Sequence, residues 1–349
     1  MYDIILCFLT SFTLTYLAIP AIINVARKKN LVDEPNDRKS HQKGIPALGG
    51  IAIFAGVLFS IVLWTPFNYF GDLQYIICAL IIIFLIGAKD DIDPIAPSKK
   101  FGGQIFAAFI LVTKANIKLT SLYGIFGVYE LPYIASLLLS MFTILVIINA
   151  FNLIDGINGL SASLSILISV TLGTWFFLTD QIELAMLAFA LAGASLAFLK
   201  YNITPALIFM GDTGAMLIGI VCAGLSIEFI EIHQSLEGSP YAFSSAPAVA
   251  IGILILPLFD TLRVFVIRIL QGKSPFYPDR SHIHHMLLDA GFTHMQATSI
   301  LMVVNVIFIF VVVQLQNFGN LSLLTIILGM AIAFIFILNF AIQKKKKSA

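Results

Sequence analysis

The chain has 349 residues, of which 59% are hydrophobic and 11% charged, with a formal net charge of +1 at pH 7. Its mean hydropathy of +0.98 excludes a soluble globular protein, because a chain of this length cannot hide so much apolar surface from water. Lipid can surround such surface on every span of a membrane protein. We expect no nucleic-acid partner.

Apolar stretches that can cross a bilayer as helices, at about 20 residues each, follow one another along the chain. They predict an all-α polytopic integral membrane protein with about eleven transmembrane helices, built as a single domain over residues 1–349. The fourth stretch is the shortest. The expected spans are residues 4–25, 48–66, 73–88, 101–113, 133–150, 160–178, 183–199, 213–232, 246–262, 297–316 and 320–342.

The distribution of lysine and arginine predicts the orientation, because these residues gather on the cytoplasmic side of a membrane. With the N-terminus outside and the C-terminus cytoplasmic, 18 of the 20 lysines and arginines lie inside. The same alternation places five polar segments on the cytoplasmic side, which predicts one active site built from several cytoplasmic loops. These segments are residues 27–50, 88–100, 149–160, 200–215 and 268–292.

Two adjacent aspartates, Asp90 and Asp91, stand at the end of the third span. An acid at the bilayer centre costs about 2.5–3.5 kcal/mol on insertion scales, whereas an acid at a span's end can meet water, a metal or a lipid headgroup. The pair is therefore either a solvated helix end or part of a reactive site.

Polar residues recur at every third position in NAFNLIDGINGL. Asn149, Asn152, Asp155 and Asn158 would share one face of a helix that continues the fifth span into the cytoplasm. A capping role explains one of these residues but not four in register.

Asp212 stands just before the eighth span, in FMGDTGA. Taken alone, it is best explained as the N-cap of that helix. Beside other carboxylates it becomes a candidate metal ligand, because magnesium usually takes one or two carboxylates together with substrate phosphates. With at most three acids and several amides, magnesium fits better than zinc.

The last polar segment carries Arg280, His282, His284 and His285. Histidine clusters bind metals, but no cysteine accompanies these three and their spacing matches no zinc motif. A guanidinium group among imidazoles is better suited to a phosphate or a sugar, because guanidinium pairs bidentately with phosphate.

Basic residues stand close to the other polar segments as well. Arg38 and His41 lie in the first segment, and Lys99 and Lys100 end the second. Such residues at a cytoplasmic membrane surface are usually topology signals, although they can also bind a lipid phosphate. The residues alone leave both interpretations open.

Five segments in order, DEPNDRKSHQKGIPALGG, AKDDID, NAFNLIDGINGL, FMGDTGA and SPFYPDRSHIHH, resemble the polyprenyl-phosphate N-acetylhexosamine-1-phosphate transferases (glycosyltransferase family 4) over roughly residues 30–290. The closing DRSHIHH after SPF looks like the branch that uses UDP-N-acetylglucosamine. The phospho-N-acetylmuramoyl-pentapeptide transferases of peptidoglycan synthesis, the alternative branch, usually show a different histidine run.

The resemblance implies transfer of N-acetylglucosamine-1-phosphate, or a related N-acetylamino sugar-1-phosphate, from its UDP-sugar to undecaprenyl phosphate. The products are undecaprenyl-diphosphate-sugar and UMP, and the cofactor is Mg²⁺ with Mn²⁺ as an alternative. The implied location is the bacterial inner membrane among membrane lipids, with a homodimer as one option. The implied pathway begins a cell-surface glycan such as O-antigen, common antigen or teichoic acid.

The resemblance also implies roles for individual residues. We expect direct attack by the lipid phosphate, because a phosphate monoester with its second pKa near 6 is already largely dianionic; a covalent aspartyl intermediate is the other route. The expected groups are catalytic Asp90, Asp91 and Asp155; metal-binding Asp212 and Asn152; nucleotide-binding Asn202, Phe209 and Asn158; sugar- and phosphate-binding Arg280, His282, His284 and His285; and lipid-phosphate-binding Lys99, Lys100, Arg38 and His41.

Three positions depart from the family pattern. Pro94 stands where the third acid of the first motif usually lies, so Asp93, one place earlier, is expected to have no direct role. Asn158 stands where many relatives have aspartate, and an amide there supplies no charge. Ala47 replaces a larger, often basic residue.

Outside this class of enzyme, an ion-coupled transporter is the main alternative. That class expects acids near the midplane and broken helices in paired positions, whereas here the acids crowd the cytoplasmic ends and no internal repeat is seen. A non-catalytic scaffold would leave the polar stripe and the histidines without a role.

Overall fold

The computed structural model describes residues 1–32, 44–66, 71, 73–236, 238–274 and 281–348. Arg38, His41 and Arg280 lie outside these residues. Within them the chain is mainly helical, with an isolated bridge between Ser121 and Glu130. Seven helices are long and apolar enough to cross a membrane, or eight if one bent pair forms a single span. The all-α, multi-pass prediction is thus confirmed.

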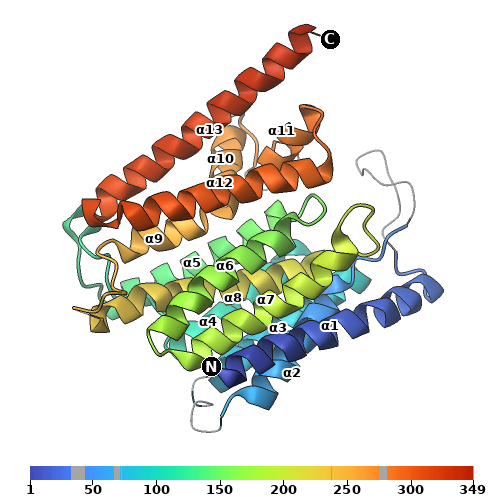
Figure 1. Cartoon of the computed structure of the whole chain (residues 1–349), viewed down its shortest axis with the longest axis horizontal. Helices are drawn as coiled ribbons and strands as arrows, with labels where there is room; N and C mark the ends of the chain where they lie inside the picture. The colour runs from blue at the N-terminus through green and yellow to red at the C-terminus, as the bar shows by residue number, and fades with distance from the viewer. Residues whose placement is uncertain (33–43, 67–70, 72, 237, 275–280, 349) are drawn as a thin grey trace.

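Loops of different lengths and three 3₁₀ turns lie between the helices of the described chain (Figure 1). Their bounds are α1 Tyr2–Lys28, α2 Gly49–Trp64, α3 Leu73–Ile92, α4 Pro97–Thr113, α5 Tyr133–Ile154, α6 Leu160–Leu178, α7 Ile182–Asn202, α8 Gly211–Ile232, α9 Ala246–Ile253, α10 Ile255–Leu270, α11 Ile283–Asp289, α12 His294–Gln314 and α13 Asn320–Ser348.

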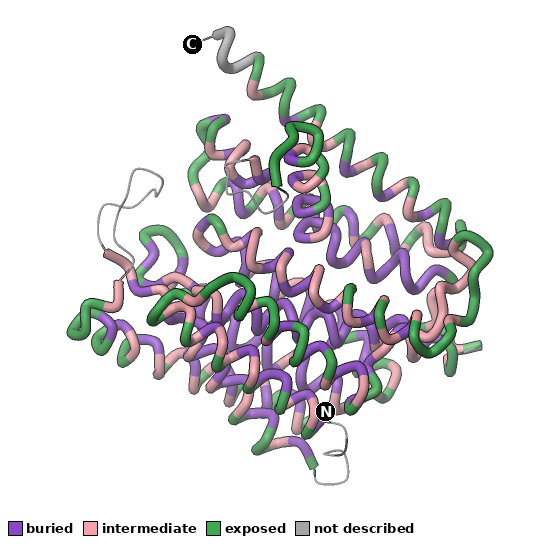
Figure 2. Tube along the Cα trace, turned by 180° about the vertical axis from the view of Figure 1, so that it is seen from behind, coloured by how far each residue is buried: buried purple, intermediate pink, exposed green. Residues whose placement is uncertain are grey.

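Helix α8 forms the centre of the bundle. It contacts α2, α3, α5 and α6, and nearly every residue along it is buried. A helix that is apolar on all sides is stable when other helices surround it. Figure 2 shows the same arrangement as a buried interior inside a more exposed outer layer. The first turn of α8 is therefore held on several sides, which matters because Asp212 lies in that turn.

The ninth predicted span, 246–262, is wrong as a continuous helix. Helices α9 and α10 meet at an angle of 81°. Pro257 lacks a backbone N–H and its ring clashes with the carbonyl four residues earlier, which is that of Ile253. The Ile253 carbonyl accepts a hydrogen bond of 3.2 Å from Asn305 Nδ2 of α12 instead. The bend is thus fixed by proline and by a side chain from the layer of α12 and α13.

Candidate active site

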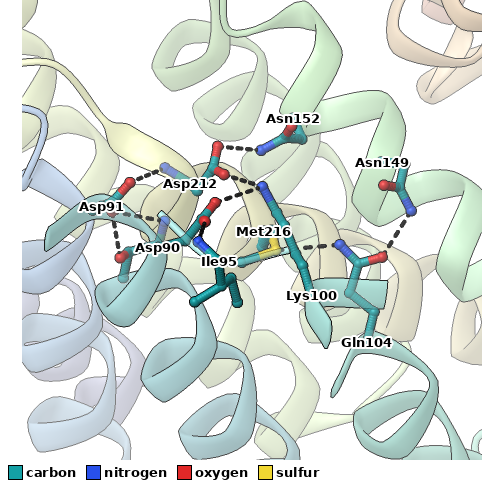
Figure 3. Close-up of polar contacts among 10 residues, drawn as sticks. Asp90, Asp91, Ile95, Lys100, Gln104, Asn149, Asn152, Asp212 and Met216 are labelled. Atoms are coloured by element: carbon teal, nitrogen blue, oxygen red, sulfur yellow. Dashed lines mark hydrogen bonds and ion pairs between the residues drawn. The ribbon is translucent and has the colours of Figure 1, made fainter. Parts of the chain in front are cut away.

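Three helices bring two acids and a lysine together at one end of the bundle. Asp90 lies in the last turn of α3, Asp212 is the second residue of α8, and Lys100 lies in the first turn of α4. Lys100 Nζ is 3.2 Å from Asp90 Oδ2 and is also paired with Asp212 Oδ2 (Figure 3). Lys100 therefore stands inside the acidic cluster and bridges its two carboxylates.

Asp91 points to the start of α8 rather than to the lysine. Its carboxylate accepts hydrogen bonds from Asp212 N at 2.7 Å, from Thr213 N at 3.0 Å and from Thr213 Oγ1 at 2.5 Å. These contacts satisfy backbone donors that a helix start leaves without partners. Asp91 caps α8 from a different helix, and the N-cap interpretation of Asp212 itself is wrong, because Asp212 lies inside α8.

Glycines explain why these helix ends can approach so closely. Gly211 has φ of +72°, and a Cβ there would lie 2.1 Å from the Ala47 carbonyl oxygen and 2.6 Å from Asp91 Oδ2. A Cβ on Gly87 of α3 would lie 2.5 Å from Thr213 Cα. Only glycine combines the left-handed conformation with the absence of a side chain. The backbone of α8 is thereby brought within reach of the Asp91 carboxylate.

Helix α5 contributes Asn152, whose Nδ2 donates to Asp212 Oδ1 at 2.7 Å. The predicted helix through all four polar positions is wrong, because α5 ends at Ile154. Asp155 leaves the helical conformation with ψ of 54°, and Asn158 lies in the turn before α6. The glycines at positions 156 and 159 make this segment a poor helix former.

Asp155 is the acid in this turn. Burial among neighbouring atoms raises the pKa of Asp155 to about 7, and the negative charges of Asp212 and Asp91 add to the rise. Part of the residue's surface remains accessible to solvent. A carboxyl in this state can hold a proton near neutral pH, and a cation bound nearby would favour its ionised form.

Gln104, which the sequence did not single out, forms a second set of polar contacts below the acidic cluster. Gln104 Oε1 accepts from Asn149 Nδ2 at 2.9 Å, and Gln104 Nε2 lies 3.2 Å from Met216 Sδ. Gln104 is only 1% exposed. The sequence pointed to this contact only through the presence of a glutamine inside the fourth apolar stretch. Asn149 Nδ2 thus donates to Gln104 and to the Leu145 carbonyl, and not to the acids of the cluster.

The residues predicted to bind nucleotide lie around the neighbouring segment 203–210. Asn202 Oδ1 accepts from Gly159 N at 2.6 Å, and Asn202 Nδ2 donates to the Ile208 carbonyl at 2.8 Å. Asn158 Nδ2 donates to Thr204 Oγ1 at 2.9 Å. Asn202 and Asn158 both tie this segment to the α5–α6 turn.

Phe209 lies at the end of the same segment. Its backbone N–H donates to the Pro46 carbonyl at 2.8 Å, and its carbonyl accepts from Gly49 N at 3.0 Å. These bonds join the start of α2 to the segment that precedes α8. The side chain is partly exposed.

Two of the three predicted histidines are buried beside the α5–α6 turn. His282 and His284 are 5% and 2% exposed, and their rings are parallel with centroids 5.5 Å apart. The His285 ring lies 4.3 Å from that of His284. Burial lowers the pKa of His284 well below its usual value, with the neighbouring His285 and His282 adding to the effect. His284 is therefore neutral near pH 7.

A buried acid on α10, Asp260, was not singled out in the sequence. Asp260 Oδ2 lies 2.9 Å from His282 Nδ1, and Asp260 Oδ1 accepts from Ile283 N at 2.9 Å. The sequence pointed to Asp260 only as an aspartate inside a predicted span. Asp260 holds the start of α11, where the histidines lie.

The remaining charged residues of the second polar segment lie away from the cluster. Lys99 is exposed. Asp93 forms an exposed ion pair with Lys89, in keeping with the expectation that Asp93 has no direct role.

The described residues contain no group of three or more His, Cys, Asp or Glu side chains arranged to hold a metal ion. Two carboxylates nevertheless converge on the Lys100 ammonium group, which stands between Asp90 and Asp212, and the Asn152 amide contacts the Asp212 carboxylate. That donor set, completed by substrate phosphates, suits magnesium. The residues present therefore fit a hard cation.

This geometry defines a class of protein, the multi-pass helical proteins whose polar site is assembled from helix ends. The chain belongs to glycosyl transferase family 4, whose sequence profile matches residues 73–230. This confirms the resemblance inferred from the five segments.

Named relatives cover most of the chain. An undecaprenyl-phosphate alpha-N-acetylglucosaminyl 1-phosphate transferase of Escherichia coli O157:H7 is 35% identical over 82% of this chain and 77% of that protein. Its counterpart in Salmonella typhi is 37% identical over the same shares. A decaprenyl-phosphate N-acetylglucosaminephosphotransferase of Mycolicibacterium smegmatis is 33% identical over 83% of this chain and 76% of that protein.

Proposed function

We propose that the protein transfers N-acetylglucosamine-1-phosphate from UDP-N-acetylglucosamine to undecaprenyl phosphate, with release of UMP. The observation that carries the proposal is the convergence of Asp90, Asp212, Asn152 and Lys100 at one end of the bundle. The transferase relatives, about a third identical over most of their length, support the same reaction. A cell-surface glycan is the proposed destination of the product.

Phosphoryl transfer depends mainly on positioning and on neutralising charge. Asp212 and Asn152, with Asp90 beside them, would hold Mg²⁺, and the ion when bound supplies neutralisation of the UDP diphosphate. Lys100 would then exchange its contacts with the acids for contacts with phosphate oxygens. Asp90 would orient the lipid phosphate for direct attack on the β-phosphate of the UDP-sugar.

Asp91 and Asp155 have different tasks in this scheme. Asp91 holds the first turn of α8, and thereby Asp212, in place. Asp155 faces the charges of the cluster from the α5–α6 turn and can hold or release a proton as the charge at the site changes. The neutral His284 beside this turn and His282 behind it would contact the sugar-phosphate.

The proposed arrangement in the membrane follows the sequence. About eleven spans would form one domain, with the N-terminus outside, the C-terminus in the cytoplasm and the site at the cytoplasmic face of the bacterial inner membrane. The lysine and arginine distribution supports this orientation. A homodimer is compatible with the exposed apolar side chains of the outer helices.

A direct assay tests the reaction. Purified protein in detergent is incubated with radiolabelled UDP-N-acetylglucosamine, undecaprenyl phosphate and Mg²⁺, and lipid-linked label and UMP are measured. We expect equal amounts of both products and no turnover in EDTA, with partial rescue by Mn²⁺. Absence of product across a panel of UDP-N-acetylamino sugars would overturn the proposal. Turnover with UDP-N-acetylmuramoyl-pentapeptide alone would move the protein to the alternative branch.

A further inference from the structure

Asp260 is the most deeply buried acid of the described residues, with 2% exposure on the mostly apolar helix α10. A buried carboxylate is costly unless hydrogen bonds and charge partners compensate it. Asp260 has both: His282 Nδ1 and Ile283 N lie 2.9 Å from its two oxygens, and Arg263 Nη1 lies 3.7 Å from Oδ1. Asp260 is therefore placed to hold the segment that begins at His282.

The contact with Asp260 determines which nitrogen of His282 is left for a ligand. A carboxylate accepts hydrogen bonds, so the Nδ1 atom that faces Asp260 Oδ2 carries a proton. In an imidazole ring the group bound at one nitrogen sets the role of the other. The remaining nitrogen, Nε2, is the atom that His282 can present to a substrate.

Packing connects this pair to the acidic cluster. The His282 ring is stacked parallel to that of His284, and a Cβ on Gly156 would lie 2.1 Å from His284 Nε2. Gly156 follows Asp155 in the turn whose acid responds to the charge of Asp212. A continuous set of contacts thus leads from Asp260 through both histidines to the turn beside the proposed metal ligands.

We propose that Asp260 is a positioning residue that acts through His282, fixing its tautomer and ring so that Nε2 accepts a hydrogen bond from a hydroxyl or amide N–H group of the UDP-sugar. The inference rests on the proposed function for the identity of the ligand. Arg263 strengthens the arrangement from the next turn of α10, because its Nη1 donates to the Ser281 carbonyl at 2.7 Å. Asp260 and Arg263, one turn apart on α10, thus both hold the start of α11.

The test compares Asp260→Asn, His282→Gln and the double variant. The control is Asp93→Asn, the same acid-to-amide change in an exposed ion pair. Equilibrium affinity for UDP-N-acetylglucosamine is measured without lipid, and kcat and KM are then measured for each substrate. We expect Asp260→Asn to weaken affinity and kcat/KM for the UDP-sugar by about 10–100-fold, the range found when the carboxylate partner of a metal-ligating histidine is removed. The KM for undecaprenyl phosphate should change less than about twofold, and the double variant should be no worse than His282→Gln.

A purely structural role for Asp260 predicts different results. It would lower kcat/KM for both substrates equally, and the loss would add to that of His282→Gln; either result overturns the inference. If Asp260→Asn does not accumulate as folded protein, Asp260→Glu is held to the same two criteria. If wild-type protein binds the UDP-sugar without turnover, the proposed function fails, whereas the affinities still decide the inference about Asp260.

Discussion

Asp212 and Asp91 differ in what they contact, although both carboxylates lie at the start of α8. Asp212 faces Lys100 and Asn152, whereas Asp91 accepts three hydrogen bonds from the first turn of α8. We expect Asp212→Asn to abolish turnover and Mg²⁺-dependent stabilisation while the apo protein unfolds at a similar temperature. The amide keeps the size of the side chain but lacks the charge that a metal needs.

Asp91→Asn should instead lower stability and activity together. The loss of a charged cap should cost about 1–2 kcal/mol of unfolding free energy, and kcat should fall because Asp212 loses its fixed position. Denaturant unfolding in detergent and steady-state assays measure the two effects. An Asp91→Asn protein with wild-type stability and no turnover would assign Asp91 to the chemistry itself.

The raised pKa of Asp155 predicts a pH dependence of the metal-free protein. The unfolded carboxyl loses its proton near pH 3.8, whereas the folded carboxyl keeps it until about pH 7. Between these values the folded state binds more protons, so this group's contribution to stability falls as pH rises through the window. We expect the melting temperature in EDTA to decline from pH 5 to pH 8 less steeply in Asp155→Asn.

Magnesium should reverse this trend, because a bound cation favours the ionised carboxyl. At pH 6.5 its addition should release protons in the wild type and fewer in Asp155→Asn, as measured with a pH indicator in weak buffer. Equal proton release by the two proteins would show that Asp155 does not respond to the bound metal.

At the scale of elements, Gln104, Asn149 and Met216 connect three of the four helices that carry the site. Each lies about one helical turn deeper than Lys100, Asn152 or Asp212 on the same helix: Gln104 on α4, Asn149 on α5 and Met216 on α8. Because helices pack as rigid units, a contact at this depth fixes the relative rotation of the site residues above it.

We expect Gln104→Leu to lower kcat about tenfold and unfolding free energy by about 1–3 kcal/mol, since the Asn149 amide loses a buried partner. The reason is that α4 and α5 lose the contact that sets their register at the site. Thr113→Val, at the far end of α4 where the hydroxyl bonds only to the Phe109 carbonyl, is the control. Unchanged kcat in Gln104→Leu would show that the remaining packing contacts are enough to set the register of α4 and α5.

Element boundaries were predictable only where one local signal dominated. The apolar lengths of α5 to α8 predicted helices at the right places. The bend at Pro257 was not predicted, because its stability depends on Asn305 of α12 supplying the partner for the Ile253 carbonyl. The polar stripe after α5 failed for a related reason: a spacing of three residues fits a helix, but glycines end α5 at Ile154.

At the scale of the whole molecule, the sequence predicted that distant polar segments meet, because alternating spans place their ends on one side. Asp90, Asn152 and Asp212 do converge in this way. The partners behind them were not predictable, because Gln104 and Asp260 lie inside apolar stretches. Their roles depend on which helix faces which, and hydrophobic pattern does not encode that choice.

The orientation in the membrane gives the last prediction. Lys118 lies between α4 and α5, at the opposite end of α4 from Lys99. Buried Cys7 and Cys222 can stay in place, while exposed Cys78 is replaced by serine. In intact bacterial cells, a membrane-impermeant maleimide should label Lys118→Cys, whereas Lys99→Cys should react only after permeabilisation. Lys118 lies outside the acidic cluster and outside the predicted binding residues, so Lys118→Cys should keep its transferase activity. The reverse labelling pattern would place the cluster on the outer face, where no cytoplasmic UDP-sugar could reach it.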